Sequence, residues 1–154
     1  MLLSKSCEYA LRASLYLTSL RADGFVSIKD ISRELRISFP FLTKIFQKLT
    51  QHGILHSFRG PRGGVALAKP ADRIMLLDIV LAVDGPELFE ECLLGLPGCG
   101  ERKPCPMHES WARERERIRG MFAAETLEGM ARRLRKTDLR LVALPLAEVK
   151  DEGA

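Results

Sequence analysis

Apolar residues recur at helical spacing along the first twenty residues of the chain. Between residues 4 and 20 they return every three or four positions, and Ala22-Asp23-Gly24 then interrupts the pattern. Such a stripe predicts an amphipathic helix with one buried face. The residues of the stripe are Leu3, Cys7, Ala10, Leu11, Leu15 and Leu17.

Two shorter patterns follow and predict a pair of helices. Ser27, with Asp30 three residues later, has the spacing of a capping box at the start of the first one. Ser38 is a second candidate N-cap, and Pro40 falls in the first turn, where its missing N–H costs nothing. Between them, residues 36–37 leave room only for a tight turn, so the pair predicts a helix-turn-helix. The apolar faces consist of Ile28, Ile31 and Leu35, then Leu42, Ile45, Phe46 and Leu49.

The next segment predicts a β-hairpin with a basic tip. Residues 54–59 and 65–68 favour strands, whereas residues 60–64 read Gly-Pro-Arg-Gly-Gly and favour a turn. A helix-turn-helix followed by such a hairpin is typical of a winged helix. The sequence therefore predicts a mainly α protein with a small β-hairpin.

The remaining pattern divides the chain at about residues 85, 106 and 137. Residues 74–84 are almost wholly apolar and predict a buried helix, but residues 86–106, with four prolines and three glycines, predict a loop. A long charged helix follows, and Thr126 is expected to restart a helix that ends near Lys136. The tail, 138–154, has no clear pattern and is expected to be flexible. The long helix should carry on one side Met107, Trp111, Ile118, Met121 and Phe122.

Composition narrows the class of protein. With 154 residues and 46% hydrophobic content, the chain can bury one sizeable core. No apolar run reaches the eighteen or so residues of a membrane span, and no basic leader precedes a long apolar stretch. We therefore expect a cytoplasmic protein without a membrane partner. Four cysteines are few for a disulfide scaffold and instead favour a metal or redox site.

Positive charge is concentrated in the first half of the chain. Residues 1–70 contain eleven lysines and arginines but only four carboxylates, and no Asp or Glu lies between Glu34 and Asp72. A segment of this kind favours binding to a phosphate backbone. By itself it would favour a solvated basic face, but it coincides here with the predicted winged helix.

The predicted second helix of the pair has side chains suited to the major groove. Glutamine can pair with adenine, lysine can reach guanine or phosphate, and an exposed helix N-terminus favours a phosphate. In the wing, arginines flank glycines that would let the backbone approach DNA, and arginine suits a narrow minor groove. The residues that we predict to bind double-stranded DNA are Ser38, Phe39, Thr43, Lys44, Gln47, Lys48, Arg59 and Arg62.

Three cysteines lie within fourteen residues of the Pro/Gly-rich loop. Cys92, Cys99 and Cys105 can converge on one metal centre, and His108 follows one helical turn after Cys105. The spacing does not decide which metal, because tetrahedral zinc also takes three cysteines and a histidine. Cys7 lies on the apolar stripe and is expected to be a core residue. Catalysis by Cys105 and His108 lacks an oxyanion hole and an orienting acid, so the chain is not expected to be an enzyme.

Four segments together resemble the iron–sulfur winged-helix transcription regulator family over residues 1–135. They are Glu8-Tyr-Ala-Leu-Arg12, Phe41-Leu-Thr-Lys-Ile-Phe-Gln-Lys-Leu49, Arg59-Gly-Pro-Arg-Gly-Gly-Val65 and Cys105-Pro-Met-His-Glu-Ser-Trp111. The resemblance implies a homodimer with crossed long helices on a palindromic operator, with half-sites about 34 Å apart. It also implies a winged-helix DNA-binding domain over 1–85, a cluster-binding loop over 86–106 and a dimerisation region over 107–137.

The resemblance leaves two choices for the fourth cluster ligand. In IscR-like members a histidine matching His108 completes a 2Fe-2S site, and in NsrR-like members an acidic residue matching Glu8 of the other subunit completes a 4Fe-4S site. We favour His108 and a 2Fe-2S cluster, because imidazole suits iron better than a lone carboxylate. The implied function is a regulator, expected to be a repressor, that responds to redox state, nitric oxide or iron–sulfur supply. A structural zinc site and a metal-free thiol sensor are the alternatives.

Overall fold

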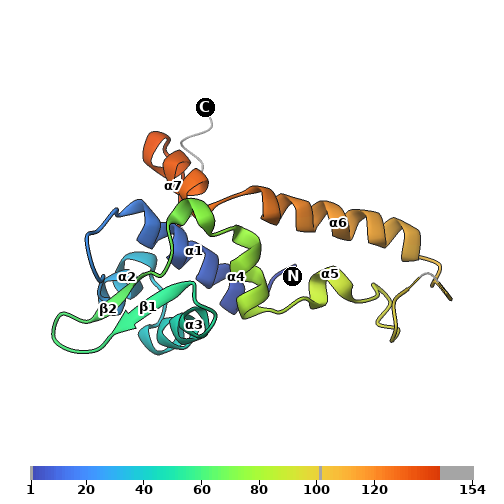
Figure 1. Cartoon of the computed structure of the whole chain (residues 1–154), viewed down its shortest axis with the longest axis horizontal. Coiled ribbons are helices and arrows are strands. Elements are labelled where there is room, and N and C mark those ends of the chain that lie inside the picture. Colours follow the sequence, from blue (N-terminus) through green and yellow to red (C-terminus); the bar gives the residue numbers. More distant parts are fainter. Residues whose placement is uncertain (1, 101, 143–154) are drawn as a thin grey trace, which may run out of the picture.

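The fold is given by a computed structural model, in which residues 2–100 and 102–142 are described. It is mainly helical with one two-stranded antiparallel sheet, as the sequence predicts. The part of the predicted flexible tail from residue 143 onward lies outside the described residues. The elements, shown in Figure 1, are α1 (Lys5–Ser19), α2 (Ile28–Leu35), α3 (Phe39–Gln51), β1 (Leu55–Phe58), β2 (Gly64–Leu67), η1 (Ala71–Arg73), α4 (Leu76–Val83), α5 (Glu87–Glu90), α6 (His108–Ala124) and α7 (Leu127–Lys136).

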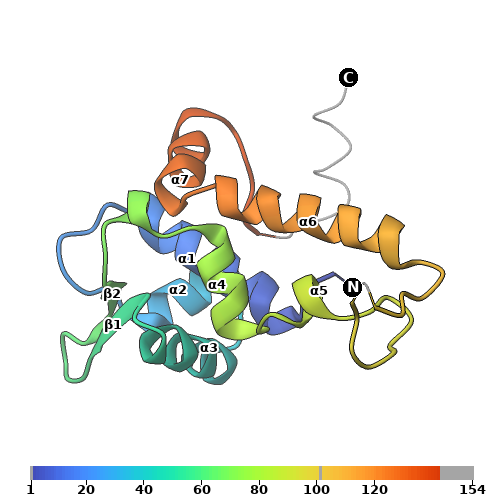
Figure 2. The same ribbon diagram turned by 45° about the vertical axis from the view of Figure 1, so that its right-hand side comes forward.

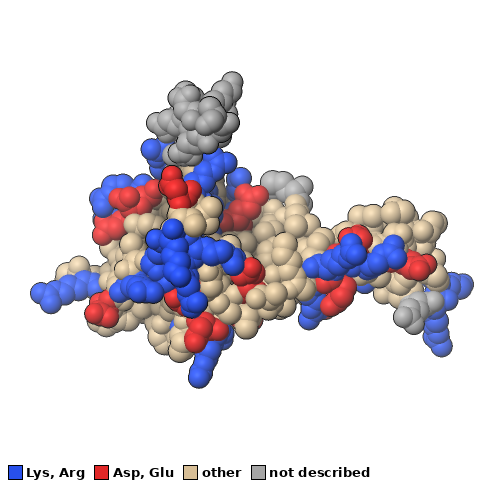
Figure 3. All heavy atoms as spheres, turned by 90° about the horizontal axis from the view of Figure 1, so that it is seen from above, with Lys and Arg blue, Asp and Glu red and all other residues tan. Residues whose placement is uncertain are grey.

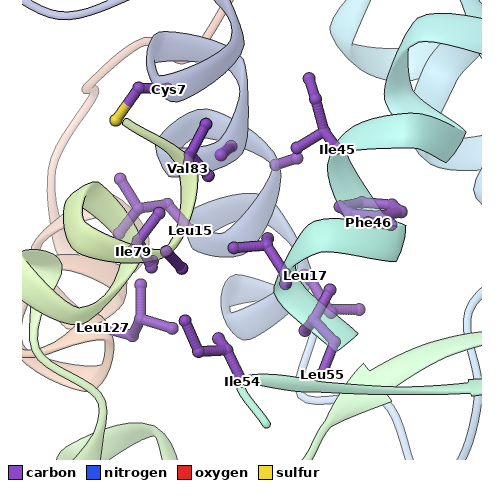
Figure 4. Close-up of a cluster of buried hydrophobic side chains, with 14 of the residues drawn as sticks. Cys7, Leu15, Leu17, Ile45, Phe46, Ile54, Leu55, Ile79, Val83 and Leu127 are labelled. Atoms are coloured by element: carbon purple, nitrogen blue, oxygen red, sulfur yellow. The ribbon is translucent and has the colours of Figure 1, made fainter. Parts of the chain in front are cut away.

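Helix α1 is the central element of the core. It begins at Ser4, whose hydroxyl accepts a hydrogen bond from the Cys7 amide at 3.1 Å. Its predicted stripe is buried except for Leu3 and Leu11, which are half-buried. Figure 4 shows its side chains turned toward those of α3, α4 and α7. The expectation that Cys7 is a core residue is confirmed, since its side chain is fully buried.

The predicted helix-turn-helix is present as α2 and α3. Arg36 closes α2 in a left-handed conformation with φ 54°, which makes the tight turn before α3. Ser38 caps α3 by accepting from the Phe41 amide, as predicted. The capping box predicted at Ser27 is wrong, because the Ser27 side chain makes no capping hydrogen bond. There the chain enters α2 from an extended segment paired with the hairpin.

That extended segment joins the two-stranded wing through a single β-bridge. Strands β1 and β2 pair in antiparallel register, and Val26 bridges Val65 through two hydrogen bonds of 2.9 Å. A Cβ on Gly64 would lie only 2.0 Å from the Val26 carbonyl oxygen. Gly64 therefore allows the hairpin backbone to lie close to the backbone at Val26. We had expected from the sequence that it would allow a close approach to DNA.

Helix α7 returns to pack against α1. Its first residue, Leu127, donates to the Ile74 carbonyl at 2.9 Å, and Leu76 donates to the Glu125 carbonyl at the same distance. Thr126 caps the helix by accepting from the Gly129 amide. We call α1–α4, the hairpin and α7 the head. Figures 1 and 2 show α3 and the hairpin on one side of the head and α7 on the other.

The remaining elements form an arm beside the head, defined here as α5, residues 91–107 and α6. In Figures 1 and 2, α6 extends away from the head and the segment after α5 lies near its far end. The one-turn helix α5 corrects the prediction of a loop throughout 86–106. Phe89 explains this helix, because it is buried edge-on against Phe122 with ring centroids 6.4 Å apart.

Helix α6 has a narrower apolar face than the sequence suggested. Phe122 is buried, but Met121 is 55% exposed and does not share its side, because consecutive helical residues project about 100° apart. Along α6 in Figure 3, basic and acidic side chains are intermixed. No helix among the described residues is both long and apolar enough to cross a membrane.

Candidate nucleic-acid interface and cysteine cluster

A groove separates α3 from the wing. Its lining includes three of the residues predicted to face DNA from α3, together with Phe58 and Arg59 from the hairpin. The three residues of α3 are spaced four apart and so occupy one face of the helix. They are Phe39, Thr43 and Gln47.

The other residues at or on α3 that we predicted to bind DNA do not line this groove. Lys44 is exposed and does not line the groove. Lys48 donates from Nζ to the Val83 carbonyl at 3.1 Å, where its charge also suits the C-terminal end of α4. The Ser38 hydroxyl is the N-cap of α3. Both lysines are thus exposed, but Lys48 is hydrogen-bonded to α4 of the head and Lys44 is not.

The wing carries exposed cations and an aromatic pair. Arg59 and Arg62 are exposed at the tip, as predicted. Phe58, which is 55% exposed, stacks on Phe25 with ring centroids 5.4 Å apart. Sequence reasoning missed this pair; the only signal was that Phe58 falls on the polar face of an alternating strand.

The basic segment between Glu34 and Asp72 is not neutralised by ion pairs. All salt bridges among the described residues involve cations outside this segment, on α1, α2, α6, α7 or at Arg21. Lys44, Arg59 and Arg62 therefore keep their full charge for an external anion. Phosphate groups of DNA are anions of the required kind.

The three loop cysteines and the histidine come together in two pairs. Cys92 Sγ lies 3.5 Å from Cys105 Sγ, and Cys99 Sγ lies 3.4 Å from His108 Nδ1. All four side chains are half-buried, and the cysteines are free thiols. In the described part of the chain no three such groups converge as a formed metal site. Three thiols and an imidazole are nevertheless the donors that zinc and iron–sulfur centres take, so these residues fit such a group.

The backbone around Cys92 favours a thiolate. Amides of Leu96 and Leu94 donate toward its sulfur and lower the pKa of the thiol, the Leu96 amide most. A thiolate is the form that binds metal ions. The loop therefore shifts one candidate ligand toward the form that coordination requires.

Two side chains of α6 hold the start of this loop, and sequence reasoning missed this role for both. Trp111 Nε1 donates to the Glu91 carbonyl at 2.9 Å, and Arg115 Nη1 donates to the same oxygen at 3.0 Å. Arg115 Nη1 also lies 3.7 Å from Cys99 Sγ. The available signal was spacing, because His108, Trp111 and Arg115 follow an i, i+3, i+7 pattern on one helix face.

The alternative fourth ligand lies on a different element. Glu8 is in the first turn of α1, where its carboxylate pairs with Lys5 at 2.8 Å. Its side chain is 37% exposed.

A helix-turn-helix beside a hairpin, with a basic segment free of carboxylates between Glu34 and Asp72, defines a winged-helix DNA-binding regulator. The chain belongs to the Rrf2 family, described as iron-dependent transcriptional regulators, whose model matches residues 3–133. The regulator IscR of Photorhabdus laumondii is 33% identical over 128 residues, covering 83% of this chain and 77% of that protein.

Solved structures have the same fold. The chain matches CymR, the global cysteine regulator of B. subtilis, with a TM-score of 0.72 and 27% identity over 84% of this chain and 95% of that one. It also matches T. potens IscR with a TM-score of 0.72 and 21% identity, covering 95% of each chain. These relatives are transcription regulators, so this chain is a regulator and not an enzyme.

Proposed function

We propose that the chain is a homodimeric repressor whose affinity for palindromic DNA is controlled by an iron–sulfur cluster on Cys92, Cys99, Cys105 and His108. The observation that carries this proposal is the pairing of these side chains at 3.5 and 3.4 Å. Membership in a family described as iron-dependent supports iron over zinc. When bound, the cluster would supply a group whose charge or integrity changes on oxidation, reduction or attack by nitric oxide.

In the proposed complex with DNA, α3 and the wing make different kinds of contact. The face of α3 along the groove offers an amide at Gln47 for a base edge. Lys44 and the wing arginines have no ion-pair partner in the described residues and would bind phosphates or the minor groove. The exposed N-terminal residues of α3, Ser38 and Phe39, lie where a phosphate would be favoured.

Control of DNA binding requires that the cluster be connected to the head. The cysteine segment is bonded to α6 through Glu91 and His108, and α6 packs against α4 of the head. In a homodimer built on α6, a change in this segment would alter the relative placement of the two heads. The two cluster states must then differ in free energy of DNA binding.

The test is anaerobic purification followed by iron and sulfide analysis and visible absorption. We expect stoichiometric iron and sulfide, lost in C92S, C99S and C105S and retained in C7A, whose thiol lies in the core of the head. Colourless protein with stoichiometric zinc would instead establish the zinc alternative. Colourless, metal-free protein whose DNA affinity changes on oxidation would establish the thiol sensor, and the Cys92–Cys105 distance of 3.5 Å is the observation that favours it.

The fourth ligand is tested by comparing H108A with E8A after reconstitution. We expect H108A to change the absorption spectrum and E8A to leave it unaltered. The reverse result would assign the ligand to Glu8 of the other subunit. Unchanged spectra in both variants would remove both residues as ligands.

A further inference from the structure

We propose that Arg115 and Trp111 are positioning residues that preassemble the cysteine segment on α6 before any metal binds. This inference rests on the proposed metal site but not on the identity of the metal. The two side chains donate to one acceptor, the backbone carbonyl of Glu91, at 3.0 and 2.9 Å. That carbonyl immediately precedes Cys92.

Both ends of the segment are thereby fixed to the first two turns of one helix. His108 is the first residue of α6, and its amide donates to the Cys105 carbonyl at 3.0 Å. The segment that carries the three cysteines is thus held by hydrogen bonds at both ends. Closing a loop in advance removes conformational entropy that the metal would otherwise have to overcome.

Arg115 adds a contact to the sulfur itself. Its Nη1 lies 3.7 Å from Cys99 Sγ, on the side chain that also meets His108. Hydrogen bonds to sulfur ligands help set the reduction potential of a cluster. Arg115 therefore both positions the cysteine segment and would influence the reduction potential of a cluster bound there.

The other arginines of α6 do not share this arrangement. Arg117 lies two residues further along, on the opposite side of the helix, and pairs with Glu114 at 3.4 Å while its side chain is 73% exposed. It provides a matched control for the loss of one positive charge. Glu91 provides a second control, because Arg115 and Trp111 bind its backbone oxygen and not its carboxylate.

The experiment titrates cobalt(II) anaerobically into the reduced, metal-free full chain and follows thiolate-to-cobalt absorption. We expect R115Q and W111F to bind cobalt about 10-fold to 100-fold more weakly than wild type, the usual effect of losing an outer-shell partner. R117Q and E91A should bind as wild type does. Because W111F keeps an aromatic ring, it tests the lost donor without removing the packing.

The R115K variant distinguishes the contribution of the positive charge from that of the hydrogen-bond geometry. A lysine keeps the charge but has a single donor centre, so it should recover little of the lost affinity. Full recovery in R115K, equal weakening in R117Q or E91A, or wild-type binding in R115Q would each overturn the assignment. In reconstituted protein, R115Q should also lower the reduction potential relative to R117Q.

These experiments also distinguish failure of the proposed function from failure of the positioning role. Wild type that binds cobalt but never assembles an iron–sulfur cluster would refute the function while leaving the positioning role intact.

Discussion

The head and the arm of this chain are stabilised in different ways. In the head, side chains from α1, α3, α4 and α7 share one core, and residues such as Phe46 and Leu127 are almost completely buried. In the arm, Phe122 is the buried residue of α6, and the segment that contains the cysteines is attached mainly through hydrogen bonds to Glu91 and by contacts among the cysteines and His108.

This difference suits the two regions to different tasks. A closely packed core holds α3 and the wing in one arrangement, which is what recognition of DNA requires. A segment with few apolar contacts can change its conformation at a small cost in free energy. A change in the cysteine segment would therefore alter the arm while leaving the DNA-reading surface of the head intact.

The largest expected effect tests whether α7 stabilises the head. Leu127 is fully buried between α7 and the rest of the core, so L127A should lower the free energy of unfolding by about 2–5 kcal/mol. L93A, at an exposed position of the arm outside α6, is the control and should change it by less than about 0.5 kcal/mol. Urea denaturation followed by circular dichroism measures both. Equal effects would mean that the head and the arm do not differ in packing.

An intermediate effect concerns pH and the core of the head. Burial, reinforced by Asp84, raises the pKa of Cys7 from 9.0 to about 12. Between these values the unfolded chain loses this proton and the folded chain keeps it, so folding stability falls as pH rises. The loss approaches about 1.4 kcal/mol per pH unit in that window. Wild type should lose stability relative to C7A between pH 9 and pH 11, and parallel pH curves would contradict the buried thiol.

The smallest effect compares two lysines one turn apart on α3. K44A and R62A should each weaken DNA binding and reduce the dependence of log affinity on log salt by about one. K48A should leave that salt dependence nearly unchanged, since its ammonium donates to the Val83 carbonyl, and should instead lower the melting temperature. Fluorescence anisotropy with labelled operator DNA at several salt concentrations gives the slopes. Identical slopes for K44A and K48A would show that both lysines face DNA.

Local sequence signals predicted most of the head. Apolar spacing located α1, α2 and α3, because a helix must bury one stripe wherever it packs. The glycines of the hairpin marked the wing, and Ser38 and Thr126, both expected at the start of a helix, cap α3 and α7. The short helix α5 was not predicted, since its only support is the contact between Phe89 and Phe122, thirty-three residues apart in sequence.

The sequence by itself determined which residues carry the chemistry: the basic segment free of carboxylates, and three cysteines in one short loop with a histidine just after it. Only the tertiary structure decided how they pair and what holds them. Spacing cannot distinguish Lys44 from Lys48, or place His108 against Cys99 instead of Cys105, because these choices depend on contacts between separate elements. The hydrogen bonds of Arg115 and Trp111 to the Glu91 carbonyl depend in the same way on how the loop folds back onto α6.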